Sequence, residues 1–504
     1  MRDLPAQRPA PFIIAAQFVV FAVALVFPLL IDLGYRLFDA EVVLISGIAA
    51  FTVLPLVFAS IRWALVRRVS FALLICWFLD LYFIEFKSEV FEWFVLAIVG
   101  LSLLPFENNL RNFSALFVGC FVMLSAVSPL KSIITPPLSE GIRATQASNS
   151  KLPLVVHLIL DEQGSPLAAS PALIASGALD RLIAEYIERG FVAHSWVRAR
   201  SGATDRSLSA LFAPPGADEG DNWAKSEGDF NYMLRRNYHV ENLQKRGFEV
   251  SVLQSSYFQL CPDQRVRCHT YPLGTYGHSM VRFDGALGDR LLLAVMEMHS
   301  EQYSTESERY VHFYKPIGDW LVIHGVLPHK RQFWTTSSMM LDVLDELGHR
   351  ASTMRPGEAY LIHLLAPHYP YVLDASCNLR DAQYWSVPDW AAEVFGQSES
   401  KLETAYWEQA KCLHSRLLAL IDTIDRVVGR EKSVIVLHGD HGSRLFHRMA
   451  HPHLNVLDAQ GPIGSLDTLL LVRAPGVKAA INSELIPLDE LLWRTLATHS
   501  LRDQ

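Results

Sequence analysis

The stretch SVIVLHGDHGSR, which runs from Ser433 to Arg444, joins an apolar segment to a polar turn. A short, continuous apolar segment of this kind predicts a buried strand over 433–438. Asp440 and His441 follow directly after it. Ligands bind at the carboxyl ends of the strands in an α/β sheet, so other strands that end in polar residues would complete a site.

Four further apolar runs of strand length lie in the same part of the chain, and helical patterns separate them. Continuous apolar strands that alternate with helices predict an α/β domain with a mostly parallel central sheet, covered on both faces. The helical pattern is clearest at 178–189 and in the long stretch 401–428. The four runs are 153–160, 248–253, 359–365 and 467–473.

Two of these runs also end in residues that bind metal ions. The first leads into Asp161 and Glu162 in LILDEQG. The third carries His363 near its end and His368 just beyond it, in HLLAPHYPY. Together with the aspartate–histidine pair after 433–438, these carboxylates and imidazoles predict a divalent cation at one sheet edge, with zinc or manganese favoured by the mixture of nitrogen and oxygen ligands.

Two glycines, Gly439 and Gly442, frame the Asp440–His441 pair. We expect them to supply the backbone freedom that lets both side chains face one ion. For the DHG motif alone, the alternative is a surface turn in which the aspartate caps a helix and the histidine is solvated. The polar residues at the ends of the other strands favour the metal site.

A nucleophile is expected in the hydroxyl-rich stretch RARSGATDRSLSALF, residues 198–212, which leads into a helical pattern. A hydroxyl at a helix N-terminus benefits from the helix dipole and from backbone donors that also bind phosphate. A nearby metal ion would lower the pKa of that hydroxyl. Ser201, Thr204 and Ser207 all qualify on composition, and a simple helix N-cap is the alternative.

The chain has 504 residues, of which 50% are hydrophobic, a net charge of −8 and a mean hydropathy of +0.19. It is too long for one ordinary domain and too apolar for a typical soluble enzyme. The apolar residues concentrate in the first quarter, where several segments are long enough to span a bilayer. Five spans are predicted, at 12–31, 42–61, 69–86, 90–106 and 113–130.

Basic residues predict the orientation of these spans. Arg62, Arg67 and Arg68 mark the loop after the second span as cytoplasmic, so five spans leave everything after about residue 135 outside the cytoplasm. The third and fourth spans contain acidic residues, which are costly in lipid. If neither of these two segments spans the membrane, the outer domain still lies outside the cytoplasm. If only one of them fails to span, the outer domain lies on the other side. The predicted organisation is a five-helix transmembrane domain at 1–134, a juxtamembrane linker at 135–150 and an outer domain at 151–504.

Four of the six cysteines lie in the outer domain. An even number of cysteines in an oxidising compartment permits disulfides. We expect Cys261 to pair with Cys268 and Cys377 with Cys412; four unpaired thiols are the alternative. No CxxC pair occurs, which argues against a thiolate zinc site.

The ordered motifs LILDEQG, GATDRSLSALF, HLLAPHYPYVLD and GDHGSR, behind five predicted spans, resemble the alkaline phosphatase/sulfatase superfamily. More narrowly, the chain is similar to the membrane-anchored phosphoethanolamine and phosphoglycerol transferases, including the lipoteichoic acid synthases. The resemblance covers nearly the whole chain in architecture but only four short motifs in sequence. The DHG and upstream H-x-P motifs are specific for the superfamily rather than for a substrate.

The resemblance implies a set of metal ligands and a nucleophile. It makes Glu162 a ligand, with Asp161 as the alternative because true sulfatases use both positions of an acidic pair. The nucleophilic threonine of the family lies three residues before a serine that begins a helix. TDRSLSALF matches that spacing, which selects Thr204 over the two serines as nucleophile and ligand. Asp440 and His441 correspond to the remaining ligands.

Histidines also correspond to residues of the family. His368 matches the histidine that binds the substrate phosphoryl group or a second ion. A further histidine usually follows the DHG motif by about a dozen residues. His453 in HRMAHPHLN fits best, with His451 and His447 as second choices. An ordinary polar surface loop is the alternative for this group of three.

The chain departs from the family in ways that bear on the substrate. Phosphoethanolamine transferases typically have SHGP where this chain has APHYP, and DHGES where it has DHGSR. The C/S-x-P-x-R frame of true sulfatases is absent, because CPDQR at 261–265 has its proline one place early. Sulfate ester hydrolysis is therefore disfavoured.

The resemblance implies an enzyme of the inner (cytoplasmic) membrane whose catalytic domain lies outside the cytoplasm, in the periplasm of a Gram-negative cell. It would transfer a phospho-head group from a membrane phospholipid to a glycolipid or glycan acceptor of the envelope, such as lipopolysaccharide, through a phospho-threonine. No nucleic-acid partner is expected. A membrane-anchored hydrolase with the same residues and a non-catalytic envelope sensor are the alternatives.

Overall fold

The computed structural model of the chain divides into two compact units. The first comprises Met1–Pro137, Tyr276–His278 and Asp284–Phe333, and the second Leu138–Thr275, Ser279–Phe283 and Trp334–Gln504. The predicted outer domain, 151–504, therefore contributes residues to both units. The described residues are 26, 30, 34–36, 38–52, 151–166, 169–213, 222–225, 232–261, 266–271, 285–299, 336–381, 399–443, 445, 466–490 and 492.

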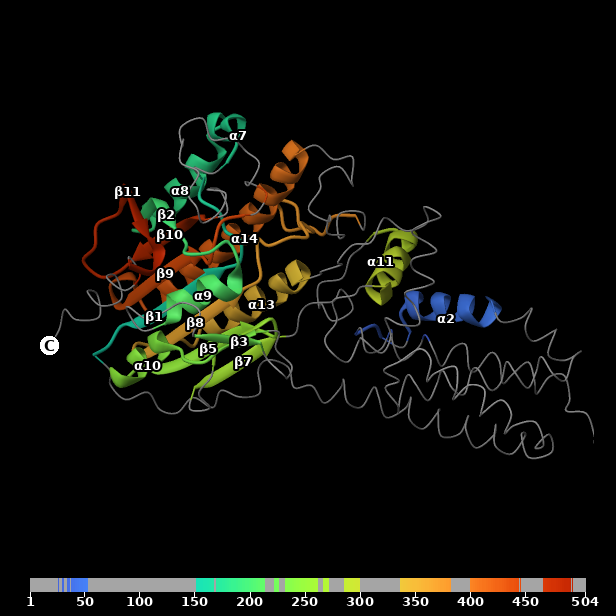
Figure 1. Cartoon of the computed structure of the whole chain (residues 1–504), viewed down its shortest axis with the longest axis horizontal. Helices are drawn as coiled ribbons and strands as arrows, with labels where there is room; N and C mark the ends of the chain where they lie inside the picture. The colour runs from blue at the N-terminus through green and yellow to red at the C-terminus, as the bar shows by residue number, and fades with distance from the viewer. Residues whose placement is uncertain are drawn as a thin grey trace, which may run out of the picture. The chain divides into compact units, whose positions relative to one another are not determined.

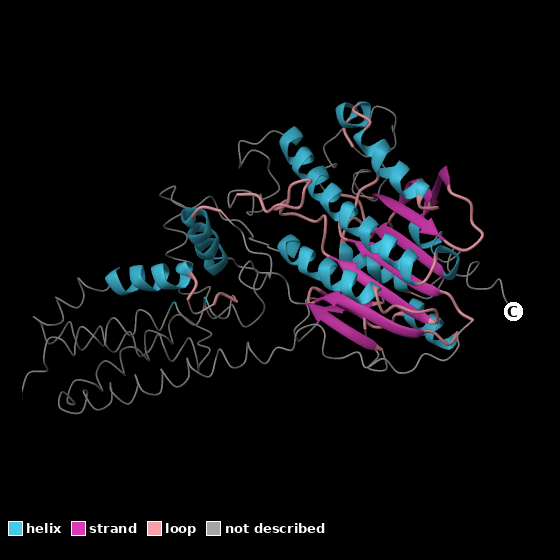
Figure 2. Cartoon of the chain, turned by 180° about the vertical axis from the view of Figure 1, so that it is seen from behind, coloured by secondary structure: helices cyan, strands magenta, loops and turns pink. Residues whose placement is uncertain are grey.

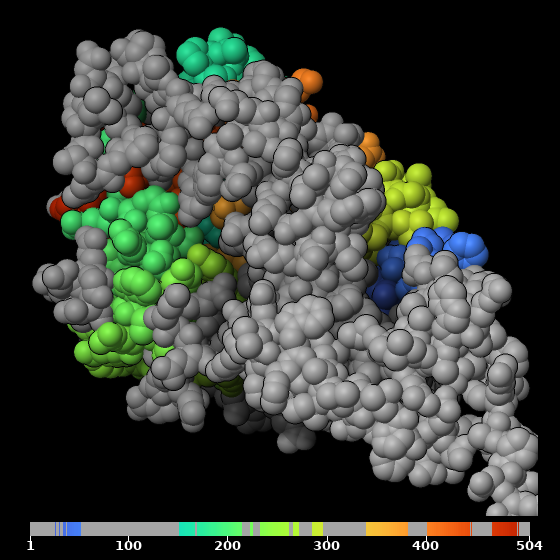
Figure 3. Space-filling model, turned by 45° about the vertical axis from the view of Figure 1, so that its right-hand side comes forward, coloured from blue at the N-terminus to red at the C-terminus, as the bar shows by residue number. Residues whose placement is uncertain are grey.

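In the first unit, two helices distant in sequence pack together. Helix α2 (Ala40–Thr52) contacts α11 (Leu287–His299), and an ion pair joins Arg290 Nε to the buried Glu41 Oε1 at 2.9 Å. The blue surface of α2 adjoins the yellow-green surface of α11 in Figure 3. No helix within the described residues is long and apolar enough to cross a membrane. Residues 42–52 of the second predicted span lie in α2, and residues 26 and 30 of the first are described. The rest of these two spans, the other three spans and the linker lie outside the described residues.

The second unit is built on an eight-stranded sheet of order β11-β2-β10-β9-β1-β8-β5-β7 (Figure 1). Strands β9, β1, β8, β5 and β7 run parallel, while β10 is antiparallel to both of its neighbours, β9 and β2. The strands are β1 (Leu154–Leu160), β2 (Val192–Arg198), β5 (Glu249–Ser255), β7 (Arg267–Tyr271), β8 (Glu358–Leu364), β9 (Ser433–Gly439), β10 (Asp467–Arg473) and β11 (Ala480–Pro487). A small second sheet has the order β3 (Trp223–Lys225), β4 (Tyr232–Leu234), β6 (Phe258–Gln259).

All five strands predicted from apolar runs are confirmed, as β1, β5, β8, β9 and β10, and so is the mostly parallel sheet. Helices α8 (Ala178–Glu188) and α14 (Glu399–Val427) confirm the two clearest helical patterns. Strands β2, β7 and β11 of this sheet were not predicted from the sequence. In β11 the side chains are mostly exposed, as expected for a strand at the edge of a sheet, so it lacks an apolar pattern.

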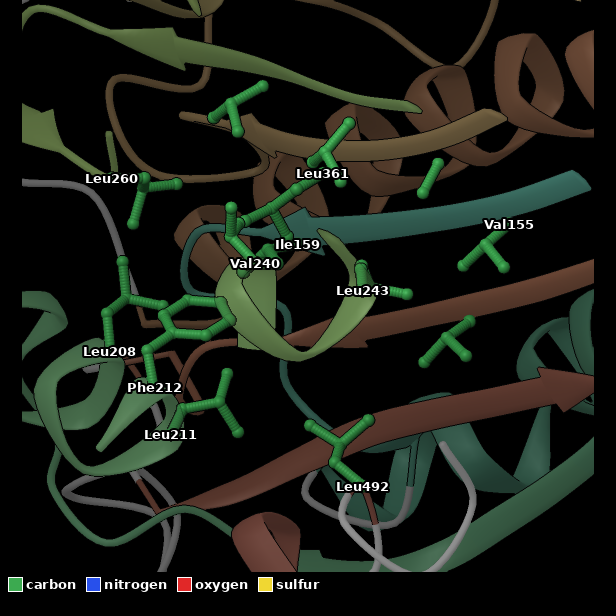
Figure 4. Packing of buried hydrophobic residues seen from close by; sticks show 14 of the residues in the cluster. Val155, Ile159, Leu208, Leu211, Phe212, Val240, Leu243, Leu260, Leu361 and Leu492 are labelled. Atoms are coloured by element: carbon green, nitrogen blue, oxygen red, sulfur yellow. The ribbon is translucent and has the colours of Figure 1, made fainter. Parts of the chain in front are cut away.

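Helices cover both faces of the sheet. Helices α9 (Thr204–Phe212) and α10 (Tyr238–Lys245) cover one face, while α8, α13 (Thr336–Ala351) and α14 cover the other, seen in Figure 2. Figure 4 shows the core beneath α9 and α10, where Leu208, Phe212 and Val240 meet the β1 side chains. Each fully buried side chain of this size contributes about 1.5–3 kcal/mol, so this packing fixes α9 firmly over the sheet.

Two disulfides join cysteines in the second unit. Cys261 is bonded to Cys268, and Cys377 to Cys412, the pairing expected from the sequence. The second bond ties the loop after β8 to helix α14. This loop also carries His368, so the bond bears on the site described next.

Candidate metal centre and nucleophile

The site lies where three adjacent parallel strands end. Because β1 lies between β8 and β9, the residues that follow these strands are brought side by side. Backbone hydrogen bonds continue one step beyond the strands, from the Asp161 amide to Leu364 O at 2.9 Å and from the Asp440 amide to Leu160 O at 3.2 Å. These bonds fix the two aspartates at the predicted sheet edge.

Asp161, Asp440 and His441 form a buried group whose ligand atoms all lie within 4.8 Å of one another. His441 Nε2 is 3.8 Å from Asp161 Oδ1 and 3.5 Å from Asp440 Oδ2. The other ring nitrogen, Nδ1, lies 2.8 Å from Gly442 O. A carbonyl can only accept, so Nδ1 is assigned the proton and Nε2 presents its lone pair to the carboxylates.

The composition and burial of this group fit a divalent cation. Burial alone would raise the pKa of Asp440, but the imidazoles of His441 and His363 and the amide of Glu162 outweigh it and hold the pKa below its usual value. An ionised carboxylate in a buried group is costly unless a positive charge compensates it. Two carboxylates and one imidazole are ligands that zinc and manganese both accept.

Glu162 lies beside this group rather than in it. Its φ of 59° is in the left-handed region, which is uncommon for a residue with a side chain. Two hydrogen bonds hold this conformation, from the Glu162 amide to Asp440 Oδ1 at 3.0 Å and from Tyr406 Oη to Glu162 O at 2.9 Å. The Glu162 carboxylate instead lies 3.7 Å from His368 Nε2. Glu162 was expected to be the ligand, with Asp161 as the alternative, whereas Asp161 is the one that belongs to the group of Asp161, Asp440 and His441.

Thr204 is the first residue of α9, and its side chain is buried against the acidic group. Its Oγ1 lies 3.2 Å from Asp161 Oδ1 and 3.3 Å from His441 Nε2. Ala203 is the N-cap, so Thr204 does not cap the helix with its side chain. Ser207 donates to Asp440 O at 2.5 Å, and Ser201 Oγ accepts the Ala203 amide. Thr204 therefore contacts the side chains of Asp161 and His441, whereas these contacts of Ser201 and Ser207 are to backbone groups.

The role expected for Gly439 differs from the one observed. It was expected to give the turn conformational freedom, but it is the last residue of β9 and belongs to the strand. A Cβ at this position would overlap the Thr468 hydroxyl and the Gln163 carbonyl. Glycine is needed here because another backbone segment passes too close for any side chain.

Four buried histidines lie on the face covered by α9 and α10. His363 and His438 flank Ile159 in the sheet register, and His157 lies two residues before it. His157 Nε2 is 2.7 Å from His438 Nε2, and His157 Nδ1 is 3.3 Å from His239 Nε2. Burial lowers the pKa of His239, His363 and His438 to about 4, so these rings are neutral at pH 7. His363 was expected at the metal-binding edge of the sheet, whereas His157 and His239 were not singled out from the sequence.

The remaining candidates are placed as follows. His368, 4% exposed, faces Glu162, and its Nδ1 lies 2.7 Å from Tyr369 O. His447, His451 and His453 lie outside the described residues. The structure therefore brings the predicted residues together: Asp161, Glu162, Thr204, His368, Asp440 and His441.

No family model matches the sequence, and no curated protein does. Among solved structures, the chain is similar to a protein in the alkaline phosphatase superfamily from Vibrio parahaemolyticus, with 10% identity and a TM-score of 0.37, over 70% of this chain and 67% of that one. It is also similar to the C-terminal periplasmic domain of EcEptC from Escherichia coli in complex with Zn, with 12% identity and a TM-score of 0.36, over 70% and 84%. A third is the phosphonate monoester hydrolase of Agrobacterium radiobacter, with 11% identity and a TM-score of 0.40, over 67% and 72%. Such low identities and TM-scores do not assign this chain a family, a metal or a reaction.

Proposed function

We propose that the chain is a metal-dependent transferase that moves a phospho-head group, of phosphoethanolamine or phosphoglycerol type, from a membrane phospholipid to a glycolipid or glycan acceptor. The observation that carries this proposal is the position of Thr204. Its hydroxyl lies at a helix N-terminus, within hydrogen-bond distance of both Asp161 and His441. A hydroxyl held against a buried acid–histidine group is the arrangement that metal-assisted nucleophilic catalysis requires.

Asp161, Asp440 and His441 would hold the cation, with Glu162 beside them. A divalent cation bound there lowers the pKa of an adjacent hydroxyl and offsets the charge of a phosphate diester. The first backbone amides of α9 have no partner within the helix, and amides of this kind suit a phosphate oxygen. The site is thus suited to an anionic ester rather than to a neutral one.

The reaction has two steps. In the first, Thr204 Oγ1 loses its proton to solvent and forms a bond to phosphorus, while the bond from phosphorus to the diacylglycerol oxygen breaks. His368, as an imidazolium, donates a proton from Nε2 to the departing oxygen. The Glu162 carboxylate, 3.7 Å away, is placed to pair with that imidazolium.

In the second step, neutral His368 takes the proton of the acceptor hydroxyl as the acceptor oxygen attacks phosphorus. The bond from phosphorus to Thr204 Oγ1 breaks, and Thr204 regains from solvent the proton that it lost in the first step, while His368 is an imidazolium again. The predicted apolar spans support this assignment, because they would hold the site at the membrane surface where donor and acceptor lie. We place the protein in the inner membrane with the second unit outside the cytoplasm.

The test is release of diacylglycerol from labelled phosphatidylethanolamine and phosphatidylglycerol by the full chain in detergent, with manganese or zinc added. Wild type and the Ser201→Ala control should both release it, whereas Thr204→Ala should not. Release of the free phospho-alcohol without an added acceptor would identify a hydrolase instead. Equal release by wild type and Thr204→Ala would contradict the proposed nucleophile.

A further inference from the structure

One buried side chain of helix α14, Gln409, contacts the backbone of the loop that carries His368 at four points. Gln409 is 0% exposed, and both ends of its amide bond to this loop. Its Nε2 donates to the carbonyl oxygens of Pro367 and His368, both at 3.1 Å, and of Pro370 at 3.4 Å. Its Oε1 accepts the Leu373 amide at 3.2 Å. An NH₂ group has two protons, so three carbonyls share them and its donor capacity is fully used.

The His368 ring follows its own backbone. Its Nδ1 bonds to the carbonyl of the next residue, and the ring lies against the Tyr369 ring with centroids 4.0 Å apart. Both contacts are local, so neither fixes the ring relative to the rest of the site. The contacts of Gln409 with the loop backbone therefore contribute directly to the position of Nε2 of His368.

The same helix also holds the turn that faces His368. Tyr406 Oη donates to Glu162 O at 2.9 Å and accepts the Gly164 amide at 2.8 Å. Tyr406 and Gln409 are three residues apart, so they are neighbours on one face of α14. One rigid helix thus positions both members of the His368–Glu162 pair.

Two further links secure the loop to the same turns of α14. Arg380 forms an ion pair with Glu408, and Cys377 is bonded to Cys412. These links bind the far end of the loop, beyond Leu373. Gln409 alone among these three connections contacts the residues on either side of His368.

We propose that Gln409 is a positioning residue that sets His368 against Glu162 for the transfer reaction. This inference rests on the proposed function, since it assigns Gln409 a role only through His368. Residues that orient active-site groups in this way typically change metal affinity or activity by about 10- to 100-fold when replaced. A glutamine that merely fills the core would affect folding but would not act through His368.

Two variants of the full chain test the proposal. Gln409→Leu has similar volume but leaves the loop carbonyls without a donor, and Gln409→Asn keeps the amide but shortens its reach. Ser415→Ala, at an exposed position of α14, is the matched control. Both Gln409 variants should lower kcat/KM by about 10-fold or more, and the control should not.

The decisive comparison is a double-mutant cycle with His368→Ala. If Gln409 acts through His368, then Gln409→Asn should cause no further loss of kcat/KM in the His368→Ala background. A loss of the same size in both backgrounds would overturn the proposal. Because Gln409→Asn is the milder change, it keeps the test valid if Gln409→Leu does not fold.

A second measurement separates failure of this inference from failure of the proposed function. Hydrogen–deuterium exchange of the full chain reports on the Leu373 amide without any turnover. Exchange there should be about tenfold faster in Gln409→Asn than in wild type, and unchanged in Ser415→Ala. If wild type turns over no donor, the proposed function fails. Unchanged exchange at Leu373 would overturn the role of Gln409 whatever the activity.

Discussion

Lowering the pH from 7 to 5 should destabilise the second unit, and His414 should account for a measurable share of the effect. This histidine is fully buried in α14, where Nδ1 lies 2.8 Å from Tyr186 Oη and Nε2 lies 3.1 Å from Gln163 Oε1. Burial lowers its pKa from 6.5 to about 3. The native protein therefore leaves His414 neutral at pH 5, while the unfolded chain protonates it.

The sign and size follow from proton linkage. Below pH 6.5 the unfolded state binds one more proton than the native state, so stability is complete above that pH and is lost as the pH falls towards 3. Each pH unit in this range costs about 1.4 kcal/mol per such group. Between pH 7 and pH 5, His414 alone should lower the free energy of unfolding by about 2 kcal/mol.

Urea unfolding of the full chain in detergent, followed by tryptophan fluorescence at pH 7, 6 and 5, measures this loss. His414→Gln removes the titrating group and should reduce the acid-induced loss by about 2 kcal/mol, whatever it does to stability at pH 7. His349→Gln is the matched control, because that side chain is exposed in the native protein. An identical pH dependence for wild type and His414→Gln would show that His414 does not contribute to the acid-induced loss of stability.

Three further predictions concern the site and the loop beside it. Asp440→Asn removes a charged ligand and should weaken manganese or zinc binding by more than about 100-fold, measured by calorimetric titration; unchanged affinity would move the metal elsewhere. Replacing both Cys377 and Cys412 by alanine opens a loop with a sequence separation of 35 and should cost about 4 kcal/mol of stability in chemical denaturation. Equal midpoints with and without the bond would contradict this. Gly439→Ala forces a Cβ against the Thr468 hydroxyl and should lower the free energy of unfolding by about 2 kcal/mol or more, measured as a lower melting temperature. A melting temperature equal to that of wild type would show that the end of β9 can move to accept the Cβ.

The strands at the centre of the sheet could be predicted from sequence because they are uniformly apolar. The apolar strand β9 and the polar turn after it indicated both the sheet and the edge where the candidate site lies. Strand β1, followed by Asp161 and Glu162, gave the same indication. Strand β2, VAHSWVR, mixes polar and apolar residues and was missed because half-buried strands lack that uniform signal. The segment Asp284–Phe333 belongs to the first unit rather than to the predicted outer domain, and no feature of its sequence indicated this.

The division of roles between adjacent acids could not be predicted. Asp161 and Glu162 are neighbours, and only the left-handed backbone of Glu162 turns its carboxylate towards His368, while the Asp161 carboxylate lies with Asp440 and His441. The contacts of Tyr406 and Gln409 with the candidate site could not be predicted either. A polar residue in a helix usually indicates a solvated face, and only tertiary structure shows that these two face the site.

Peptide mapping by mass spectrometry of the full chain, quenched during turnover of labelled phospholipid, shows which residue carries the covalent intermediate. We expect a phospho-head-group adduct on Thr204 in wild type, and none on any residue of the Thr204→Ala variant. An adduct on another residue, or turnover in Thr204→Ala at the wild-type rate, would contradict the assignment of Thr204 as the nucleophile.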